Sequence, residues 1–424
     1  MNKKNYLLLL VILILIAGIF LFLRKEKIIP MEKTYTGDNN KFDFKIINEA
    51  NNSFKDNFMI SPVSIAYALT MLEEGSTDNT KAQLDNVLEN YKLPEITNVK
   101  DRISLANLLF INNMYKKEIN GGYIKLLQDG YDSDLIFDNF ETPKKINDWI
   151  SNKTFNMIND AVQTLTPDTV LGLANAIAID LEWANQFECN NTTKHEFNLI
   201  DGTKMETPMM NSSNDITYIE SDNAKGIIKE YKRYSAKTGE ATYDPEDKDA
   251  ITLEYIAILP NTNIEEYKKV FNAEELNKLL SNKKTSNYKL DINYHLPKYT
   301  YDFDYSGFKE TLVRMGLTDA FSQLASFKKM KNEDSKLQLY VNDALHKSHI
   351  EVSENGTKAA AVTVIMLRDS AMPYEEEKEE INITFDKPFI YIIKEKESDN
   401  IWFYGTVYKP MDFKDNPKCE IDYQ

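Results

Sequence analysis

Residues 356–367 read GTKAAAVTVIML, a run of small residues that passes into β-branched and apolar ones. This composition is poor for a helix, and no capping residue begins one here. With the period of two that a strand requires, one face of the run carries no charge, whereas Lys358 and the following Arg368 fall on the other face. The run predicts a central β-strand, and the pattern leaves open a plain strand or loop of small residues. The charge-free face consists of Thr357, Ala359, Ala361, Thr363, Ile365 and Leu367.

Upstream of this run the folded part of the chain begins with helices. Ser61 and Pro62 combine an N-cap residue with a proline suited to the first helical position, and Gly75 supplies a stop signal. The spacing of the apolar residues between them predicts one helix. A second helix is expected from about Thr77.

Strands dominate the later sequence. Residues 171–181, LGLANAIAIDL, form an almost continuous apolar run that predicts a strand buried on both faces. Residues 389–393 and 401–407 predict two more strands, and the polar residues 397–400 between them predict a hairpin. Because helices come first and strands follow, the predicted fold class is α+β.

Composition excludes several classes of protein. The chain has 424 residues, of which 42% are hydrophobic and 27% charged, as in a folded globular protein. The formal net charge is −16; since residues 1–27 carry +4, the remainder carries −20, which does not suit binding to nucleic acid. Two cysteines, Cys189 and Cys419, cannot build a disulfide framework, and the sequence leaves open whether they pair. No cofactor is expected.

The N-terminal residues predict a membrane segment. Residues 6–23, YLLLLVILILIAGIFLFL, contain no charge, and a helix of this length would extend ~27 Å, enough for a bilayer core. An uncleaved signal-anchor over residues 1–29 is favoured over a cleaved signal because no small-x-small site follows the apolar run. We expect this segment to anchor the rest of the chain outside the cytoplasm, or the chain to be secreted if the segment is removed.

The remainder of the chain is predicted to form one domain. After a polar linker over residues 30–40, residues 41–424 show no internal repeat and no long linker. Residues 235–248 predict a polar loop inserted between two strands, without a readable role. The acidic run 375–380 predicts a solvated loop.

No enzyme is expected, because G-x-S-x-G, Walker, H-E-x-x-H and C-x-x-C motifs are all missing from the sequence. His346 and His349 would suggest a metal site if they lay on a helix. Residues 346–353 instead alternate as in a strand with one buried face, so the two histidines point to opposite faces and no metal site is expected. His346 is interpreted as a structural, hydrogen-bonded residue.

Several motifs together resemble those of the serpin family along nearly the whole predicted domain. Each motif alone is only moderately specific, whereas their common order is very specific. The motifs are NFMISPVSIAYALTMLEEGSTDNTKAQL (57–84), SLANLLF (104–110), INDWISNKTFNMI (146–158), LANAIAIDLEWANQFE (173–188), LPKY (296–299), LVRMGLTDAFS (312–322), LHKSHIEVSENGTKAAAVT (345–363) and FDKPFIYII (385–393).

The resemblance implies a fold of three β-sheets and about nine helices with an exposed reactive loop, here over residues 354–380. It also implies a monomeric suicide inhibitor of serine-type endopeptidases. The protease attacks the loop as a substrate, and the cut loop inserts into the main sheet as a new strand, which drags the acyl-enzyme away and distorts it. A non-inhibitory serpin-fold binding module is the alternative function.

The resemblance also assigns roles to residues. Small hinge residues would pass into the sheet without obstruction, and their charge-free face would be exposed before cleavage and buried after it. Non-inhibitory relatives often carry bulky or charged residues or proline there, so this hinge favours a working inhibitor. The hinge residues are Glu354, Gly356, Thr357, Ala359, Ala360, Ala361 and Thr363, and the residues expected to gate the sheet by hydrogen bonds are Ser64, Asn175 and His346.

The scissile bond has two candidates. Counted from Glu354 with the family's usual spacing, it lies between Ser370 and Ala371, and a small residue there suits an elastase-like or subtilisin-like protease. The alternative is the bond between Arg368 and Asp369, which a trypsin-like protease would recognise. The segment from the hinge to Pro388 is longer than in many relatives, which leaves the choice open.

Overall fold

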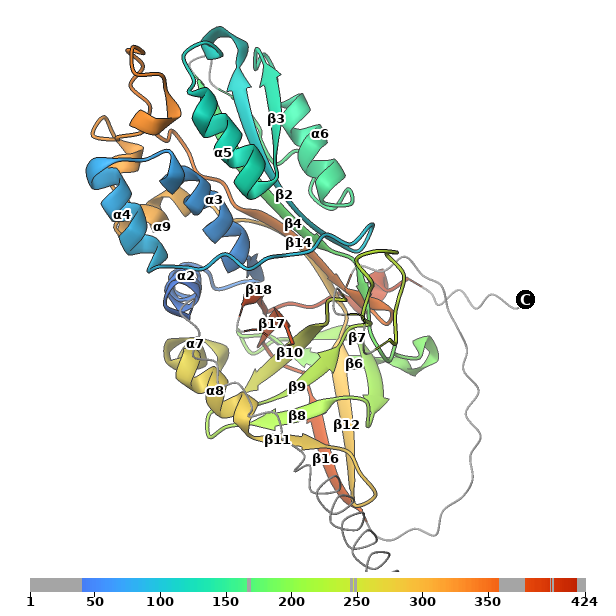
Figure 1. Cartoon of the computed structure of the whole chain (residues 1–424). Helices are drawn as coiled ribbons and strands as arrows, with labels where there is room; N and C mark the ends of the chain where they lie inside the picture. The colour runs from blue at the N-terminus through green and yellow to red at the C-terminus, as the bar shows by residue number, and fades with distance from the viewer. Residues whose placement is uncertain are drawn as a thin grey trace, which may run out of the picture.

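The structure, a computed structural model, describes residues 40–165, 169–244, 247, 250–357, 378–396, 398 and 400–417 (Figure 1). Within these residues the chain forms an α+β fold with eight α-helices, one fewer than the number expected. The helices are α2 (Asn40–Ser53), α3 (Pro62–Glu74), α4 (Asp78–Leu88), α5 (Gly121–Tyr131), α6 (Lys144–Lys153), α7 (Ile264–Val270), α8 (Ala273–Ser281) and α9 (Phe308–Arg314).

The strands form four sheets in the described part of the chain. The strands are β1 (Phe58–Ile60), β2 (Ile103–Asn112), β3 (Ser133–Asp138), β4 (Leu171–Ile179), β5 (Leu181–Glu182), β6 (Thr192–Asn198), β7 (Lys204–Ser213), β8 (Thr217–Glu220), β9 (Ala224–Glu230), β10 (Leu253–Pro260), β11 (Lys283–Thr285), β12 (Leu290–Pro297), β13 (Tyr299–Asp304), β14 (Lys347–Val352), β15 (Gly356–Thr357), β16 (Glu379–Thr384), β17 (Phe389–Glu395) and β18 (Ile401–Val407).

Helix α3 forms as its sequence predicts. Ser61 is the N-cap and its side chain accepts a hydrogen bond from the Ser64 N–H, while Pro62 occupies the first helical position and Gly75 follows the last turn. Helix α4 begins directly after Thr77, as predicted. The apolar face of α3 contacts both β4 and β18, so this helix lies between two sheets.

The C-terminal hairpin is also confirmed. Strands β17 and β18 pair antiparallel in the middle of a seven-stranded sheet with the order β1-β18-β17-β10-β9-β8-β11. Strands β9 and β10 pair next to them, and the chain between these two strands contains the predicted loop 235–248. At the opposite end of the molecule from α7 and α8, helices α5 and α6 lie beside β2 and β3 (Figure 1).

A second sheet has the order β16-β12-β7-β6, in which β12 and β16 run parallel. Glu379 and Glu380 begin β16 and are exposed. The prediction of a loop over 375–380 is therefore wrong for these two residues, because they pair with Leu290 and Asp291 of β12.

The expectation of three sheets is not met, since the described residues form two further sheets, β13-β14-β15-β5 and β3-β2-β4. Only Asp180 separates β4 from β5, so one continuous chain segment belongs to both sheets. The two sheets would be one if β4 paired with β14, but among the described residues β4 pairs only with β2. The prediction that residues 171–181 are buried on both faces is accordingly wrong for Leu171–Asn175, which are only partly buried.

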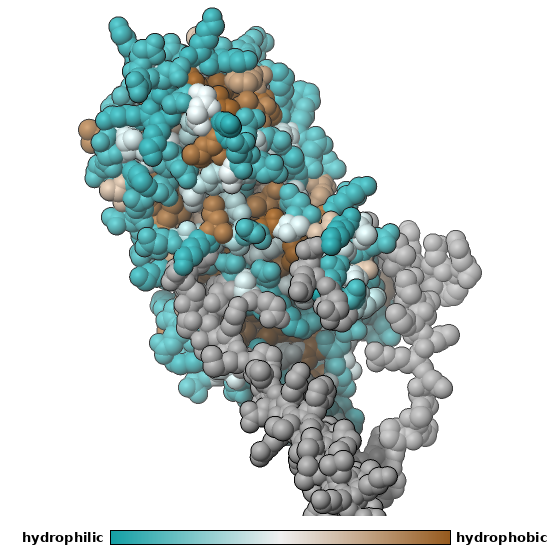
Figure 2. All heavy atoms as spheres, viewed as in Figure 1, coloured by the Kyte–Doolittle hydropathy of each residue, from teal (hydrophilic) through white to brown (hydrophobic). Residues whose placement is uncertain are grey.

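Buried apolar side chains form two large clusters on either side of the seven-stranded sheet. One cluster contains Ile65 and Leu69 of α3, and the other contains Tyr255 of β10 and Tyr294 of β12. The face drawn in Figure 2 is mostly hydrophilic, and hydrophobic residues show in smaller areas between the polar ones. No helix among the described residues has the length and apolar character needed to cross a bilayer. The predicted membrane segment, residues 6–23, lies outside the described residues.

Candidate functional site

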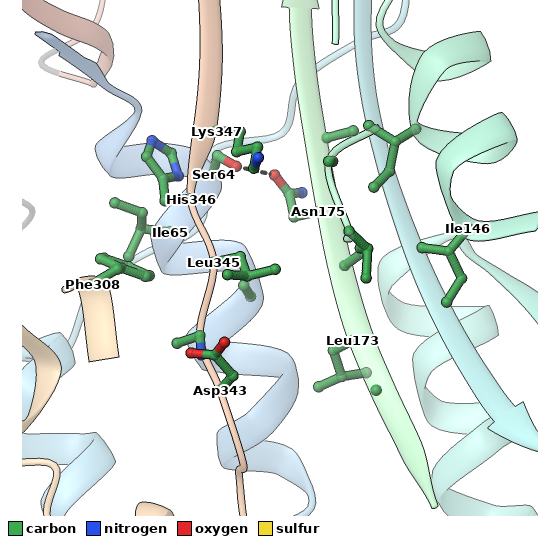
Figure 3. Close-up of a pocket in the computed structure, with 18 of the residues that line it drawn as sticks. Ser64, Ile65, Ile146, Leu173, Asn175, Phe308, Asp343, Leu345, His346 and Lys347 are labelled. Carbon is green, nitrogen blue, oxygen red and sulfur yellow. Dashed lines mark hydrogen bonds between the residues drawn. The ribbon is translucent and has the colours of Figure 1, made fainter. Parts of the chain in front are cut away.

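The missing pairing between β4 and β14 leaves a cavity of about 490 Å³. Strand β4 lines one side and residues 338–351 line the other, so we call this cavity the slot. Figure 3 shows Leu173 and Asn175 of β4 across from Asp343 and Leu345, with Ser64 of α3 between the two edges. Ile65 of α3 also lines the slot. Ile146 and Ile150 of α6 also line the slot. The two long sides of the cavity are extended chain segments, as they would be on either side of a strand missing from a sheet.

At one end of the slot a strand has already begun. Gly356 and Thr357 form β15, which pairs antiparallel with β5 on one side and with Val352 of β14 on the other. A Cβ atom on Gly356 would lie 2.0 Å from the Leu181 carbonyl oxygen, so only glycine fits this close approach. The expectation that the charge-free face is exposed before cleavage is therefore wrong for Thr357, which is 3% exposed.

The residues before β15 are fixed to the chain after β5. The Asn355 carbonyl accepts from the Trp183 N–H at 2.9 Å, and the Glu354 carbonyl accepts from the Phe187 N–H at 3.0 Å. The Trp183 ring N–H donates to the Ser353 carbonyl at 2.9 Å. The hinge start, residues 354–357, is thus held by backbone and side-chain hydrogen bonds along its length.

A buried ion pair anchors the hinge start. The Glu354 carboxylate lies 2.8 Å from Lys298 Nζ and accepts a hydrogen bond of 2.7 Å from the Thr192 hydroxyl. Both charged side chains are largely buried. Removing either charge would leave the other buried without its partner, which is far more destabilising than never having the pair.

Thr357 also has a specific partner below the sheet. Its hydroxyl lies 2.5 Å from the Tyr231 hydroxyl, and the Tyr231 ring stacks on Trp183 with 4.6 Å between ring centroids. Burial raises the pKa of Tyr231 well above its ordinary value, so its phenol stays neutral. A neutral, apolar environment of this kind accepts a threonine and rejects a charged side chain.

The β4 edge of the slot is tied to α3 and β2. The Ser64 hydroxyl donates to the Asn175 side-chain carbonyl. The Asn175 amide donates to Asn107 Oδ1 of β2 at 2.8 Å, and the Asn107 amide donates to the Tyr131 carbonyl at 2.8 Å. This line of hydrogen bonds fixes the position of β4 relative to the start of α3.

The opposite edge is tied to the same turn of α3. His346 Nε2 accepts from the Ser61 N–H at 3.2 Å, and the Ser348 hydroxyl donates to the Met59 carbonyl at 2.7 Å. Burial lowers the pKa of His346 to about 4, although Asp304 opposes this shift, so the ring is neutral at pH 7. The first turn of α3 therefore positions both edges of the slot.

The interpretation of a strand is confirmed for His349, which lies in β14, whereas the buried His346 directly precedes that strand. Ser348, Ile350 and Val352 are buried in β14, whereas His349 lies on the other face with its Nδ1 2.7 Å from the Asp302 carboxylate. The three residues expected to gate the sheet, Ser64, Asn175 and His346, all line the slot. Whether they gate it stays a prediction.

The hinge residues divide into two sets. Glu354, Gly356 and Thr357 lie at the end of the slot, as described above. Eight further predicted site residues lie outside the described residues: Ala359, Ala360, Ala361, Thr363, Arg368, Asp369, Ser370 and Ala371. Cys189 is disulfide-bonded, and Cys419 lies outside the described residues.

Sequence reasoning missed three residues beneath the hinge: Lys298, Tyr231 and Lys229. Lys229 is 1% exposed, donates to Asp215 and to the Tyr294 hydroxyl at 2.7 Å each, and has a pKa that burial lowers. Lysine alternating with apolar residues is typical of a solvent-facing strand position, so no local signal marks this one as buried. Lys298 belongs to the quoted motif LPKY, but only the fold shows that it meets Glu354.

The comparisons agree with this geometry. The model of the family described as "Serpin (serine protease inhibitor)" matches residues 37–410. The chain belongs to the serpin family. An uncharacterised serpin-like protein of Thermococcus kodakarensis is 28% identical over 90% of this chain and 87% of that protein. Alpha-1-antitrypsin of Meriones unguiculatus is 28% identical over 87% of each chain.

Solved serpin structures share the fold. The crystal structure of a thermophilic serpin, tengpin, in the native state matches with a TM-score of 0.71 and 27% identity, over 88% of this chain and 94% of that one. Serpins are generally protease inhibitors and not enzymes, which agrees with the absence of a catalytic motif in the sequence. In this serpin the slot, with the two-residue strand β15 at one end, is the candidate functional site.

Proposed function

We propose that this serpin is a monomeric suicide inhibitor of a serine-type endopeptidase. The protease cleaves the reactive loop, and the segment after Thr357 then fills the slot as a new strand between β4 and β14. The observation that carries this proposal is the paired hinge start, because β15 already lies between the two edges that the new strand must join.

The register of β15 predicts the partners of the inserted strand. Thr357 lies opposite Leu181 and Val352. Continued without interruption, the same antiparallel register brings residues 358–367 opposite 171–180 on one side and 342–351 on the other. Apart from Asp180, the residues of these two ranges line the slot along its length. The predicted strand GTKAAAVTVIML thus ends with Leu367 opposite Leu171, where β4 begins.

The faces of the inserted strand also match the slot. Every second residue from Thr357 falls on the side of Ser348, Ile350 and Val352, which are buried. The charge-free face would therefore turn inward. The one charged residue in the strand, Lys358, would lie on the opposite face at the level of Asp180 and Glu351, whose carboxylates complement its charge.

Thr363 takes a specific position in this register. It falls opposite Asn175 on β4 and opposite His346 on the other edge, so its hydroxyl would reach the hydrogen-bonded residues at the start of α3. We infer that Ser64, Asn175 and His346 act as the gate by exchanging part of their hydrogen bonds for contacts with the arriving strand. Apolar residues beyond Thr363 would add burial at ~25 cal/mol per Å².

The residue before the scissile bond determines which class of protease would be the target. With Ser370 in that position, an elastase-like or subtilisin-like protease is favoured, and with Arg368 a trypsin-like protease is favoured. The test is to incubate the purified domain with one protease of each kind and to look for a complex that survives SDS. Mass spectrometry of the released peptide then identifies the bond.

The outcomes separate the candidates. A released peptide that begins at Ala371 supports Ser370, and Ser370→Arg should then redirect inhibition to trypsin through a bidentate pair with the carboxylate of its pocket. A peptide that begins at Asp369, with trypsin trapped, supports Arg368, and Arg368→Ala should abolish that trapping. Cleavage by every protease without any stable complex would contradict inhibition and favour a non-inhibitory binding module.

The location of the inhibitor is part of the proposal. An apolar segment over residues 6–23 would hold the serpin domain at a membrane, outside the cytoplasm, or would export it after cleavage. Carbonate extraction of membranes that carry the full chain distinguishes the two: an anchored chain stays in the pellet, whereas a secreted one is released.

A further inference from the structure

The chain between β9 and β10, residues 231–252, begins beside the hinge start. Sequence analysis predicted a loop at 235–248 but gave it no role. We call residues 231–252 the brace, for the contacts that follow. They are described except for residues 245, 246, 248 and 249.

The first residues of the brace hold β5. The Lys232 N–H donates to the Glu182 carbonyl at 2.8 Å, and Lys232 Nζ donates to the Glu182 carboxylate at 2.6 Å. The Ala184 N–H donates to the Glu230 carbonyl at 2.9 Å, just before the brace. Strand β5 is only two residues long, and its other edge pairs with β15. The contacts with the brace therefore hold in place the strand on which the hinge start pairs.

A second cation holds Glu182 from another direction. Arg102 Nη2 lies 3.2 Å from the Glu182 carboxylate, and the Arg102 guanidinium lies 4.9 Å above the Tyr234 ring of the brace. The side chains of Arg102, Glu182 and Lys232 are all between a fifth and a third exposed. Partial burial strengthens such contacts relative to fully solvated ion pairs.

The described residues of the brace contact one another through backbone and side-chain hydrogen bonds. The backbone of Tyr234 forms isolated antiparallel β-bridges with Ala241 and with Ile251, two residues further along the brace. The Arg233 guanidinium donates to the Asp244 and Asp247 carbonyls at 3.0 Å each. A segment ordered in this way can hold Lys232 and Tyr234 in fixed positions, because its own entropy is already reduced.

We propose that the brace fixes β5 as the edge on which the hinge pairs, and that it thereby favours insertion of the cleaved loop over release of the protease. Its effect on the hinge needs no protease, whereas its effect on inhibition rests on the proposed function. Without the brace, β5 would separate more often from residues 354–357, and the new strand would begin later after cleavage.

Lys232→Met tests the proposal in the uncleaved protein. Methionine keeps the length of the side chain but loses the contact with the Glu182 carboxylate. The Trp183 and Phe187 amides donate to hinge carbonyls, so their hydrogen exchange measures how often the hinge leaves the sheet. We expect about fivefold faster exchange at both amides in Lys232→Met, which is the upper end of the range expected for losing a partly exposed ion pair.

The matched control is Lys396→Met. Lys396 Nζ lies 2.6 Å from the Glu230 carboxylate, so this variant also removes a lysine–glutamate pair near the brace, but one that does not hold β5. Exchange at Trp183 and Phe187 should match the wild type. Equal exchange in wild type and Lys232→Met, or an equal increase in both variants, would overturn the proposal.

Inhibition gives the second measurement. Lys232→Met should divert more of the protease to cleavage, so more inhibitor is consumed for each enzyme trapped, while Lys396→Met should behave as the wild type. If the wild type traps no protease, the proposed function fails, but the exchange experiment still decides the role of the brace. If the wild type traps a protease and exchange at the hinge amides does not change in Lys232→Met, the proposed role of the brace is wrong, whereas the proposed inhibitory function is supported.

Discussion

The hydrogen bond that ties His346, on one edge of the slot, to Ser61 depends on the protonation state of the His346 ring. Its Nε2 accepts from the Ser61 N–H, so protonation at that nitrogen would remove the contact with α3. The charged group facing the ring is Asp304, whose effect on the His346 pKa is smaller than that of burial. The Phe308 ring, with its centroid 5.7 Å from that of His346, adds apolar surroundings. A single buried imidazole thus makes the slot sensitive to acid.

Acid should therefore lower the free energy of unfolding. The His346 pKa is about 4 in the folded state and ~6.5 unfolded, so between these values the unfolded chain binds more protons. The stability that depends on the neutral ring is constant above pH 6.5 and is lost as the pH drops, and the loss totals about 3 kcal/mol below pH 4. Urea unfolding should show a loss of about 2 kcal/mol from this residue between pH 7.5 and 5. His346→Gln should remove this part of the pH dependence, and His349→Gln on the opposite face should not; equal pH profiles in all three proteins would contradict the assignment.

At the scale of elements, β15 has the largest consequence for function although it contains only two residues. Because β15 is paired on both sides, the proposed insertion would have a defined starting register. The adjacent buried pair of Glu354 and Lys298 holds this register from outside the strand. Insertion can therefore continue an existing ladder, which avoids the cost of nucleating a new one.

Thr357→Arg should convert the inhibitor into a substrate. The side chain of Thr357 is buried against Tyr231, and a guanidinium there would lose its water without a partner, at a cost of several kcal/mol. Residues 356–357 would then leave the sheet, while the loop would still be cleaved. On a gel, the variant should give cleaved inhibitor and little SDS-stable complex. Lys358→Arg, one position later on the outward face, should form the complex as the wild type does, and equal complex formation by both variants would show that the faces are assigned wrongly.

For the molecule as a whole, the proposed function requires that filling the slot makes the chain more stable than the uncleaved fold. The cavity of about 490 Å³ borders apolar side chains of β4, α3 and α6 that lack part of their packing. Filling it with residues 358–367 would add two ladders of hydrogen bonds and bury the charge-free face. Under the proposed function, cleavage would free one end of the loop and make this gain available.

Cleavage near Ser370 should accordingly raise the thermal midpoint. A gain of several kcal/mol corresponds to a rise of about 10 °C at ~2 °C per kcal/mol for a domain of this size. Melting curves before and after limited proteolysis measure it. Cleaved Thr357→Arg should show a much smaller rise, and an unchanged or lower midpoint in the cleaved wild type would exclude insertion.

Local patterns in the sequence determined the elements that depend on near neighbours. Ser61, Pro62 and Gly75 define the ends of α3 because capping and φ restriction act within one turn. The alternation around His346 predicted β14 because side-chain direction in a strand follows the sequence. The order of the motifs identified the family, whereas the hinge and gate roles that it implies stay predictions.

The tertiary structure alone decided which strands pair. Residues 171–181 read as a fully buried strand, yet within the described part of the chain β4 has a neighbouring strand on one side only, and the two edges of the slot are tied separately to the start of α3. The contacts of Glu354 with Lys298, and of Lys232 with Glu182, join residues far apart in the sequence. Pairing and burial are properties of the whole packed chain, so no local pattern could show that the hinge begins inside the sheet or that the brace stands behind it.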